Sequence, residues 1–215
     1  SLIDQNNFDA KINYLKLNEK SGFKLTNLST HVKINKYTLD IPYATFDLPH
    51  THLSTDSILI KTTKDDDNNI NWAKTQFKLK ISQANIKPSD FKHFIPEFEK
   101  LKEQTSISAK IDGTLDDLKV SKLSLTYGNT ISVDANIEST NLHNIKDSYF
   151  KCSINHIRFD KNSVQNLVTN ISKQSITLPN EINNLGICQY SGTISGYLSN
   201  LVLYGNLNTA IGNIK

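Results

Sequence analysis

Apolar and polar residues alternate along most of this chain. Phe8, Ala10 and Ile12 are apolar, and polar residues separate them. Because successive side chains of a β-strand point to opposite faces, this period of two predicts strands with one buried face. Similar runs recur to the C-terminal end and predict roughly a dozen strands in a mainly antiparallel, mainly β fold.

Several local features set the limits of these strands. The phase of the alternation changes at Tyr14–Leu15, which predicts a β-bulge there. Residues 19–22 have the composition of a hairpin turn. Pro49 ends the pattern at 46–49, because proline cannot donate to an interior ladder. A further strand is expected over 57–63, followed by a polar loop.

The hairpin around Gly128–Asn129 permits a prediction of register. A two-residue loop would pair Leu125 with Ser132, an apolar side chain opposite a polar one. A three-residue loop over 128–130 pairs Leu125 with Val133, so that apolar side chains share a face. Since cross-strand partners lie on the same face, we expect the three-residue loop.

Short helical inserts interrupt the strands. Residues 88–103 have apolar side chains at helical spacing, and Pro96 is expected to divide them into two short helices. The phenylalanines of this insert either pack onto the sheet or form a lid or partner surface. A second insert is expected over 163–173.

A short phrase recurs in the chain. The run Gly113–Val120 returns as Gly196–Leu203, and a looser echo lies at 22–28. Each of the first two copies ends one strand-like run and begins another. Such a repeat indicates one elongated unit over 1–215, built by adding similar strands.

Composition limits the possible functions. The chain has 215 residues, 37% hydrophobic residues and a net charge of +3, with a mean hydropathy of −0.41. There is no basic stripe, so we expect no nucleic-acid partner. No apolar run is long enough to span a membrane, and methionine is absent, so we interpret the chain as an excised fragment whose membrane anchor can lie elsewhere.

The candidate chemical sites are weak. His50 and His52 could begin a metal site, but no third ligand is indicated. The acidic loop 65–69 resembles a calcium loop, but Ile70 stands where glycine is required. We therefore expect no metal, no cofactor and no enzyme activity. Cys152 and Cys188 are either packed free thiols or, in an oxidising compartment, a disulfide.

Four phrases, taken in order, resemble the TamB family within the AsmA-like group, in the form found in Bacteroidota. They are LKLNEKSGFKL (15–25), SDF followed by Phe94, Pro96 and Phe98 (89–98), IDGTLDDL followed by Tyr127–Gly128 (111–128), and LP, LG, Gly192 and GYLSNL (178–201).

The resemblance implies an elongated, strongly curled antiparallel sheet with short helical inserts, called a β-taco or repeating β-groove. It implies a periplasmic segment of a bridge-like protein that is anchored in the inner membrane outside this fragment. It also implies transport of phospholipids to the outer membrane and a BamA-like outer-membrane partner. A periplasmic location would favour pairing of Cys152 with Cys188.

We expect the apolar faces of one strand and one hairpin to line the groove and contact phospholipid acyl chains. The residues are Phe77, Leu79, Ile81, Leu123, Leu125, Ile131, Val133, Ala135 and Ile137. The same residues would also suit a closed protein core. Two other functions remain open: a scaffold or chaperone for outer-membrane protein translocation and assembly, and an adhesin or glycan-binding module.

Overall fold

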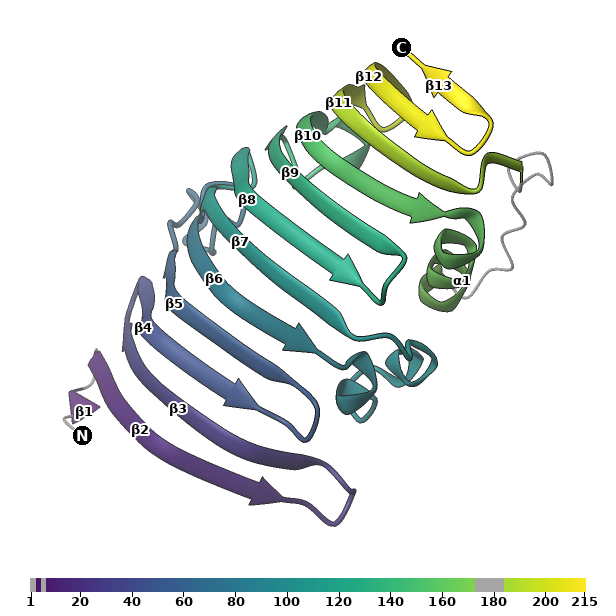
Figure 1. The fold of residues 1–215 in the computed structure, drawn as a ribbon. Helices are drawn as coiled ribbons and strands as arrows, with labels where there is room; N and C mark the ends of the chain where they lie inside the picture. Colours follow the sequence, from purple (N-terminus) through teal and green to yellow (C-terminus); the bar gives the residue numbers. More distant parts are fainter. Residues whose placement is uncertain (1–2, 5–6, 173–183) are drawn as a thin grey trace.

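The computed structural model describes residues 3–4, 7–172 and 184–215. They form one antiparallel sheet of 13 strands, in which each strand pairs with the next one along the chain (Figure 1). The strands are β1 (Ile3–Asp4), β2 (Asn7–Asn18), β3 (Lys24–Asn35), β4 (Thr38–Asp47), β5 (His52–Lys61), β6 (Gln76–Ile86), β7 (Thr105–Gly113), β8 (Asp117–Tyr127), β9 (Ile131–Thr140), β10 (Tyr149–Asp160), β11 (Ile187–Tyr197), β12 (Asn200–Thr209) and β13 (Gly212–Ile214). The sheet is not closed, because β1 and β13 lie at opposite ends of the strand order.

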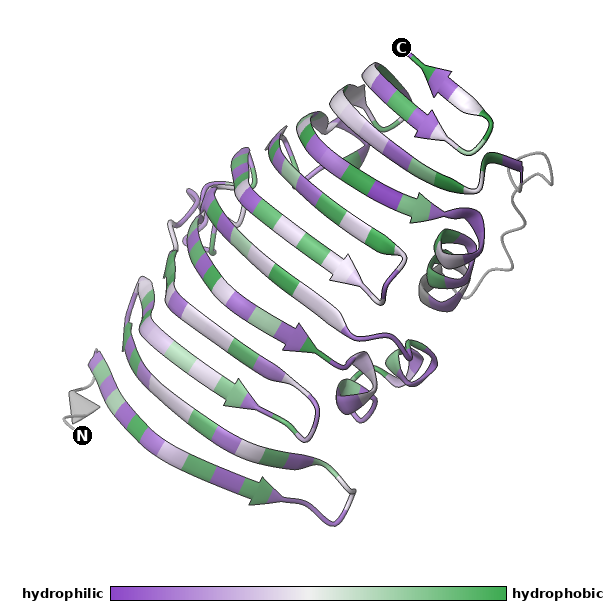
Figure 2. Ribbon diagram, in the orientation of Figure 1, coloured by the Kyte–Doolittle hydropathy of each residue, from purple (hydrophilic) through white to green (hydrophobic). Residues whose placement is uncertain are grey.

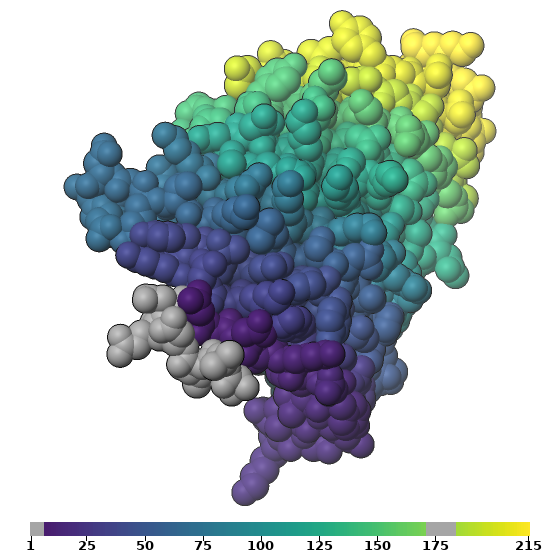
Figure 3. All heavy atoms as spheres, turned by 90° about the vertical axis from the view of Figure 1, so that its left-hand side faces the viewer, coloured from purple at the N-terminus to yellow at the C-terminus, as the bar shows by residue number. Residues whose placement is uncertain are grey.

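The mainly β, antiparallel fold predicted from the alternation is confirmed. In the space-filling view, the colours follow one another in bands from the N-terminal strands to the C-terminal ones (Figure 3). The strand expected over 57–63 is shifted. β5 begins at His52, directly after the turn that contains Pro49, and ends at Lys61.

The predicted register of the β8–β9 hairpin is confirmed. Leu125 pairs with Val133, and Tyr127 pairs with Ile131, which leaves residues 128–130 as the loop. The predicted bulge in β2 is also present, because the pairing with β3 shifts between Ile12 and Leu15.

Bulges or irregularities of this kind occur in most of the strand pairs, near the middle of the strands. They interrupt the pairs β2–β3, β3–β4, β5–β6, β6–β7, β7–β8, β8–β9, β9–β10 and β10–β11. A bulge bends the strand that carries it, and the ribbon drawing shows the strands bent along their length (Figure 1).

Side-chain hydroxyls satisfy backbone carbonyls near these bulges. The buried Thr30 donates to the carbonyl oxygen of Tyr43 at 3.1 Å. The buried Thr55 donates to the carbonyl oxygen of Lys80 at 2.8 Å. Because an unpaired buried carbonyl is costly, these threonines stabilise the interrupted ladder.

The two copies of the repeated glycine phrase adopt the same turn. Gly113 is the last residue of β7, at φ +126°, and Gly196 is the residue before the last of β11, at φ +134°. A Cβ atom on Gly113 would lie 2.0 Å from the carbonyl oxygen of Asp117, and one on Gly196 would lie 2.2 Å from that of Asn200. Both positions therefore require glycine. The echo at Gly22 is different, since a Cβ atom there would meet only the His93 ring at 3.6 Å.

The predicted helical inserts are present with changed details. The first consists of two 3-10 helices, η1 (Pro88–Phe91) and η2 (Pro96–Lys100), so Pro96 does start a second helix. A third 3-10 helix, η3 (Ile145–Asp147), lies between β9 and β10. The α-helix α1 (Lys161–Ser172) begins two residues before the predicted start. Residue 173 and the phrase at 178–179 lie outside the described residues.

Asp160 explains the early start of α1. Its carboxylate accepts hydrogen bonds from the backbone N–H of Ser163 at 3.0 Å and from the Ser163 hydroxyl at 2.7 Å. Burial acts to raise the pKa of Asp160, but these bonds, the N–H of Asn162 and the nearby Arg158 together lower it below its ordinary value. An ionised N-cap of this kind stabilises the first turn of a helix.

The helices η1, η2 and α1 lie at one edge of the sheet, where the even-numbered strands end (Figure 1). Phe91 stacks on Phe46 of β4 with ring centroids 6.3 Å apart, and Phe94 meets Phe23 edge-on at 5.0 Å. Phe91 thus packs onto the sheet, whereas Phe94 packs against the turn before β3 and stays largely exposed. A small core forms at this edge from Leu25, Leu48, Ala84 and Leu101, all of which are buried.

Candidate functional site

The register of the strands joins apolar side chains into rows that run across the sheet. We call one of them the long row, because direct cross-strand pairs connect it without a break from β2 to β13. Its members are Leu15, Leu28, Phe46, Leu53, Ala84, Ile107, Leu125, Val133, Ile157, Tyr190, Leu207 and Ile214. Since paired residues share a face, this row defines an apolar face of the sheet.

A second apolar row runs across β4–β12 on the same face. Its members are Ile41, Ile58, Leu79, Ile111, Val120, Ile137, Cys152, Ile194 and Leu203. Between it and the long row lies a central row of mostly small residues, close to the bulges. The central row contains Thr30, Ala44, Thr55, Ile81, Ala109, Leu123, Ala135, Ile154, Gly192 and Gly205.

All the residues predicted to line a groove lie on this apolar face. Leu125 and Val133 belong to the long row, and Leu79 and Ile137 belong to the second row. Ile81, Leu123 and Ala135 belong to the central row, while Phe77 and Ile131 lie just outside the two apolar rows. Ile131 and Ala135 are buried and the others are half-buried.

The apolar face has no second layer over it among the described residues. Each strand packs mainly against its neighbours in the sheet, and α1 contacts β10 and η2 at the edge. Most side chains in the two apolar rows are half-buried, and their burial therefore comes from neighbours in the same sheet. A filled sandwich core is absent from the described part of the chain.

Two apolar hollows open on this face. The larger has a volume of 510 Å³, and its lining includes Ile157, Phe159, Tyr190, Ile194, Leu203 and Leu207. The smaller has a volume of 280 Å³, and its lining includes Ile58, Ile60, Phe77, Leu79, Ile111 and Leu118. The smaller hollow contains two of the residues predicted to line a groove.

The opposite face of the sheet is polar through most of its length. Lys78 forms an ion pair with Asp112 at 3.8 Å, and Lys119 forms one with Glu138 at 3.7 Å, each across a strand pair. The alternation between the two faces is visible as alternating green and purple along the strands (Figure 2). Exposed ion pairs of this kind add little stability, but they keep this face hydrated.

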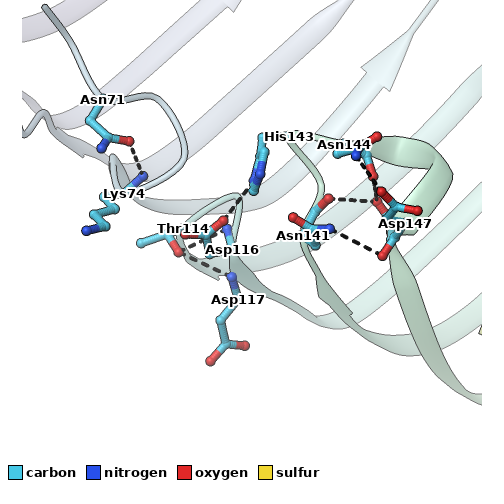
Figure 4. A network of polar contacts seen from close by, with 10 residues as sticks. Asn71, Lys74, Thr114, Asp116, Asp117, Asn141, His143, Asn144 and Asp147 are labelled. Atoms are coloured by element: carbon cyan, nitrogen blue, oxygen red, sulfur yellow. Dashed lines mark hydrogen bonds and ion pairs between the residues drawn. The ribbon is translucent and has the colours of Figure 1, made fainter. Parts of the chain in front are cut away.

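Polar contacts tie the turns together at the edge where the odd-numbered strands end (Figure 4). Asp116, in the β7–β8 turn, forms an ion pair with His143 at 2.8 Å. Its N–H donates to the carbonyl oxygen of Ala73, and its own carbonyl accepts from the N–H of Asn141 at 3.2 Å. Three loops that are distant in sequence are thereby held side by side.

One feature of the apolar face was missed by the sequence analysis. Gly192 and Gly205 pair directly, and the Tyr190 hydroxyl crosses them to donate to the carbonyl oxygens of Thr193 at 3.1 Å and Tyr204 at 3.0 Å. A Cβ atom on either glycine would lie 2.9 Å from this hydroxyl. The available signal was glycine within strand-like runs, which marks close backbone approach.

The histidines considered as metal ligands do not converge. His50 contacts Asp90 at 3.1 Å, and His52 contacts Asp47 at 2.5 Å. In the calcium-like loop, Asp65 accepts the backbone N–H of Asn69 at 2.8 Å, as in an ordinary polar turn. The described residues contain no group of three or more side chains placed to hold a metal ion.

The two cysteines cannot form a disulfide with each other in this fold. Cys152 pairs with Ile194, whereas Cys188 lies six residues earlier in the same neighbouring strand. At the rise of a β-strand this offset is about 20 Å, far beyond the roughly 7 Å limit for a disulfide. Both thiols are free, and burial raises the pKa of each. The pairing that the resemblance favoured is therefore wrong.

No family profile, curated protein or solved structure matches this chain. Within the part of the chain that the structure describes, no helix is both long enough and apolar enough to cross a membrane.

Proposed function

We propose that the apolar face binds phospholipid acyl chains, in a periplasmic segment of a bridge-like protein of the TamB type that carries lipids between membranes. The observation that carries this proposal is the long row, which crosses the sheet without a break on a face over which the described residues place no second layer. Large exposed apolar surfaces on soluble proteins mark binding sites.

The chemistry of the face suits a lipid tail. Burying one CH₂ group is worth about 0.8 kcal/mol, so a dozen of them contribute about 10 kcal/mol without any directional contact. The face holds neither a cluster of metal ligands nor a reactive thiolate among its described residues. We therefore propose a conduit with broad lipid selectivity and no catalytic role.

The bulges and the central row support a curled trough in the sense of a β-taco. The bulges in β2, β4, β6, β8 and β10 bend these strands at a similar level. Small side chains along that level, such as Ala109, Ala135 and Gly192, let the two apolar rows approach each other across the bend. Acyl chains would then lie along the central row with the apolar rows as walls.

On the same resemblance, we propose that the full-length protein is anchored in the inner membrane and meets a BamA-like partner in the outer membrane. Both interactions are assigned to regions outside residues 1–215. They are independent of the lipid-binding face and are tested separately, by pull-down of an outer-membrane barrel with the full-length protein.

The direct test is lipid binding by the purified chain. We expect mass spectrometry of an organic extract to detect phospholipid, and a photoreactive phospholipid to label the apolar face. Val133→Asp, in the long row, should abolish both signals while leaving a folded and soluble chain. The matched control is Ser132→Asp. Ser132 lies on the polar face of the sheet, where it pairs with Thr126 and Arg158.

The outcomes that contradict the proposal are specific. Absence of phospholipid from the wild-type chain would exclude the conduit and favour the scaffold or chaperone function. Equal lipid labelling of the Val133→Asp and Ser132→Asp variants would also exclude it. If Val133→Asp unfolds, as judged by circular dichroism, Val133 is a core residue and the assignment fails at that position.

A further inference from the structure

A polar pocket lies at the edge of the sheet that carries η1, η2 and α1 (Figure 1). Its volume is 370 Å³, and every residue that lines it has a polar side chain. Three segments form it: the end of η2 with the residues after it, the β8–β9 hairpin loop and one face of α1. That face carries Ser163, Asn166 and Asn170, whose spacing of three and four residues places them on the same side of the helix.

Hydrogen bonds fix the walls of this pocket. The Arg158 guanidinium donates to the carbonyl oxygen of Asn129 at 2.7 Å, which anchors the hairpin loop. The hydroxyls of Ser163 and Thr130 lie 2.7 Å apart and join the loop to α1. Because a hydroxyl has a single proton and Ser163 donates its own to Asp160, Thr130 is the donor to Ser163. The pocket is therefore formed before a ligand binds, which lowers the ordering cost of binding.

Hydrogen-bond donors dominate the lining of the pocket. Lys100 and Lys102 contribute two exposed ammonium groups, and among the described residues neither takes part in an ion pair. The half-buried Tyr127 adds a phenol O–H. Three side-chain amides complete the set of donors, those of Asn129, Asn166 and Asn170. Donors from three segments thus line one cavity, which suits an anion with several oxygen atoms.

Glu103 is the acidic residue of the lining, and its side chain lies against the hairpin. A Cβ atom on Gly128 would lie 2.9 Å from Oε2 of Glu103 and 3.2 Å from its Cγ, so the glycine makes room for this side chain. One carboxylate against the two ammonium groups of Lys100 and Lys102 leaves the lining with a net charge of +1. A phosphate diester, which carries a single negative charge and several acceptor oxygens, matches this balance.

The pocket borders the apolar face of the sheet. Tyr127 pairs with Ile131, two residues along each strand from the Leu125–Val133 pair of the long row. Residues two apart in a strand share a face, so the Tyr127 ring lies on the apolar face while the residue also lines the pocket. The step between the two pairs is about 7 Å at the rise of a strand, so a group in the pocket lies close to anything bound on the long row.

From these observations we propose that the polar pocket binds a phosphate ester. Lys100 and Lys102 would neutralise its charge, while the phenol of Tyr127 and the neighbouring amides donate to its oxygens. A free phosphate ester and the headgroup of a phospholipid both carry this group. The headgroup as source rests on the proposed function, because acyl chains on the apolar face would bring their own phosphate to the pocket.

An NMR titration of the whole chain with glycerol phosphate tests the pocket without acyl chains. We expect a dissociation constant of about 1 mM, the weak affinity of a small ligand at an open site. The double variant Lys100→Gln with Lys102→Gln should raise this constant at least about tenfold, because it removes both cations. The matched control is Lys110→Gln with Lys151→Gln, which removes the same charge from exposed positions on the polar face and should leave the constant unchanged.

A soluble short-chain phosphatidylglycerol separates the two sources of the phosphate. If the headgroup is the source, this lipid should bind more tightly than glycerol phosphate. Val133→Asp should then remove the gain and leave the binding of glycerol phosphate unchanged. Equal affinities for the two ligands would assign the pocket to free phosphate esters.

Two results would overturn the phosphate site: no chemical-shift change in the pocket at saturating glycerol phosphate, or equal weakening by the two double variants. Both are independent of phospholipid labelling on the apolar face, which tests the proposed function. A failure of one can therefore be told from a failure of the other.

Discussion

Replacing Gly113 with alanine tests the turn that the repeated phrase encodes. The residue sits at φ +126°, where L-residues are strained by about 1–3 kcal/mol. Its new methyl group would lie 2.0 Å from the carbonyl oxygen of Asp117, so the strand ends must separate. The hydrogen bond from the Thr114 N–H to the same oxygen, at 2.9 Å, is then lost, at a cost of about 1 kcal/mol.

Together these effects predict a destabilisation of about 2–4 kcal/mol. For a chain of this size, each kcal/mol lowers the melting temperature by about 2–4 °C, so we expect a decrease of roughly 4–16 °C. Urea unfolding followed by circular dichroism measures the free energy of unfolding, and thermal unfolding measures the shift. Gly196→Ala should give a similar value, because its methyl group would lie 2.2 Å from the carbonyl oxygen of Asn200.

Gly212→Ala separates strain from collision. Gly212 has φ +151°, but a Cβ atom there would meet nothing within 4 Å. We expect this control to cost at least about 1 kcal/mol less than Gly113→Ala, the share of the lost hydrogen bond alone. The reasoning is refuted if the two variants are equally stable, because the contact with the Asp117 carbonyl would then carry no penalty.

Three further predictions concern other parts of the sheet. Asp160→Ala should destabilise the chain by about 1 kcal/mol at neutral pH through loss of the α1 cap. Since the pKa of Asp160 is lowered by folding, the difference in unfolding free energy should shrink as pH falls below 3.8 and the wild-type carboxylate is protonated. An unchanged difference in urea titrations at low pH would exclude the ionised cap. Thr55→Val should cost about 1–3 kcal/mol in urea unfolding because it leaves the Lys80 carbonyl without its 2.8 Å hydrogen bond, and a neutral substitution would show that another donor replaces the hydroxyl. Cys152 and Cys188 should remain unpaired on non-reducing gels and react slowly with iodoacetamide, because burial raises the pKa of both thiols; an intrachain disulfide would contradict the strand register.

The strands and one hairpin register could be predicted because they depend on a local signal. Alternation fixes which residues share a face, and face matching then decides the loop length at 128–130. The repeated glycine phrase was informative for a similar reason, since a left-handed turn position next to a facing carbonyl admits only glycine.

Other features depend on contacts between distant residues. The Tyr190 hydroxyl finds its carbonyl partners only once Gly192 and Gly205 are paired. Alternation also cannot distinguish an open face from a closed core, because both bury every second residue.

The pairing of every strand with its successor has a consequence for how such a chain can grow and unfold. Among the described strands, none depends on a partner from a remote part of the sequence, so inserting or deleting one whole hairpin leaves all remaining neighbours in place. An array coupled only between nearest neighbours gains stability roughly in proportion to its length and loses structure from its ends inward. Duplication of a single hairpin would therefore lengthen this molecule without changing the pairing of the other strands. The short sequence separation between paired strands would keep its folding fast.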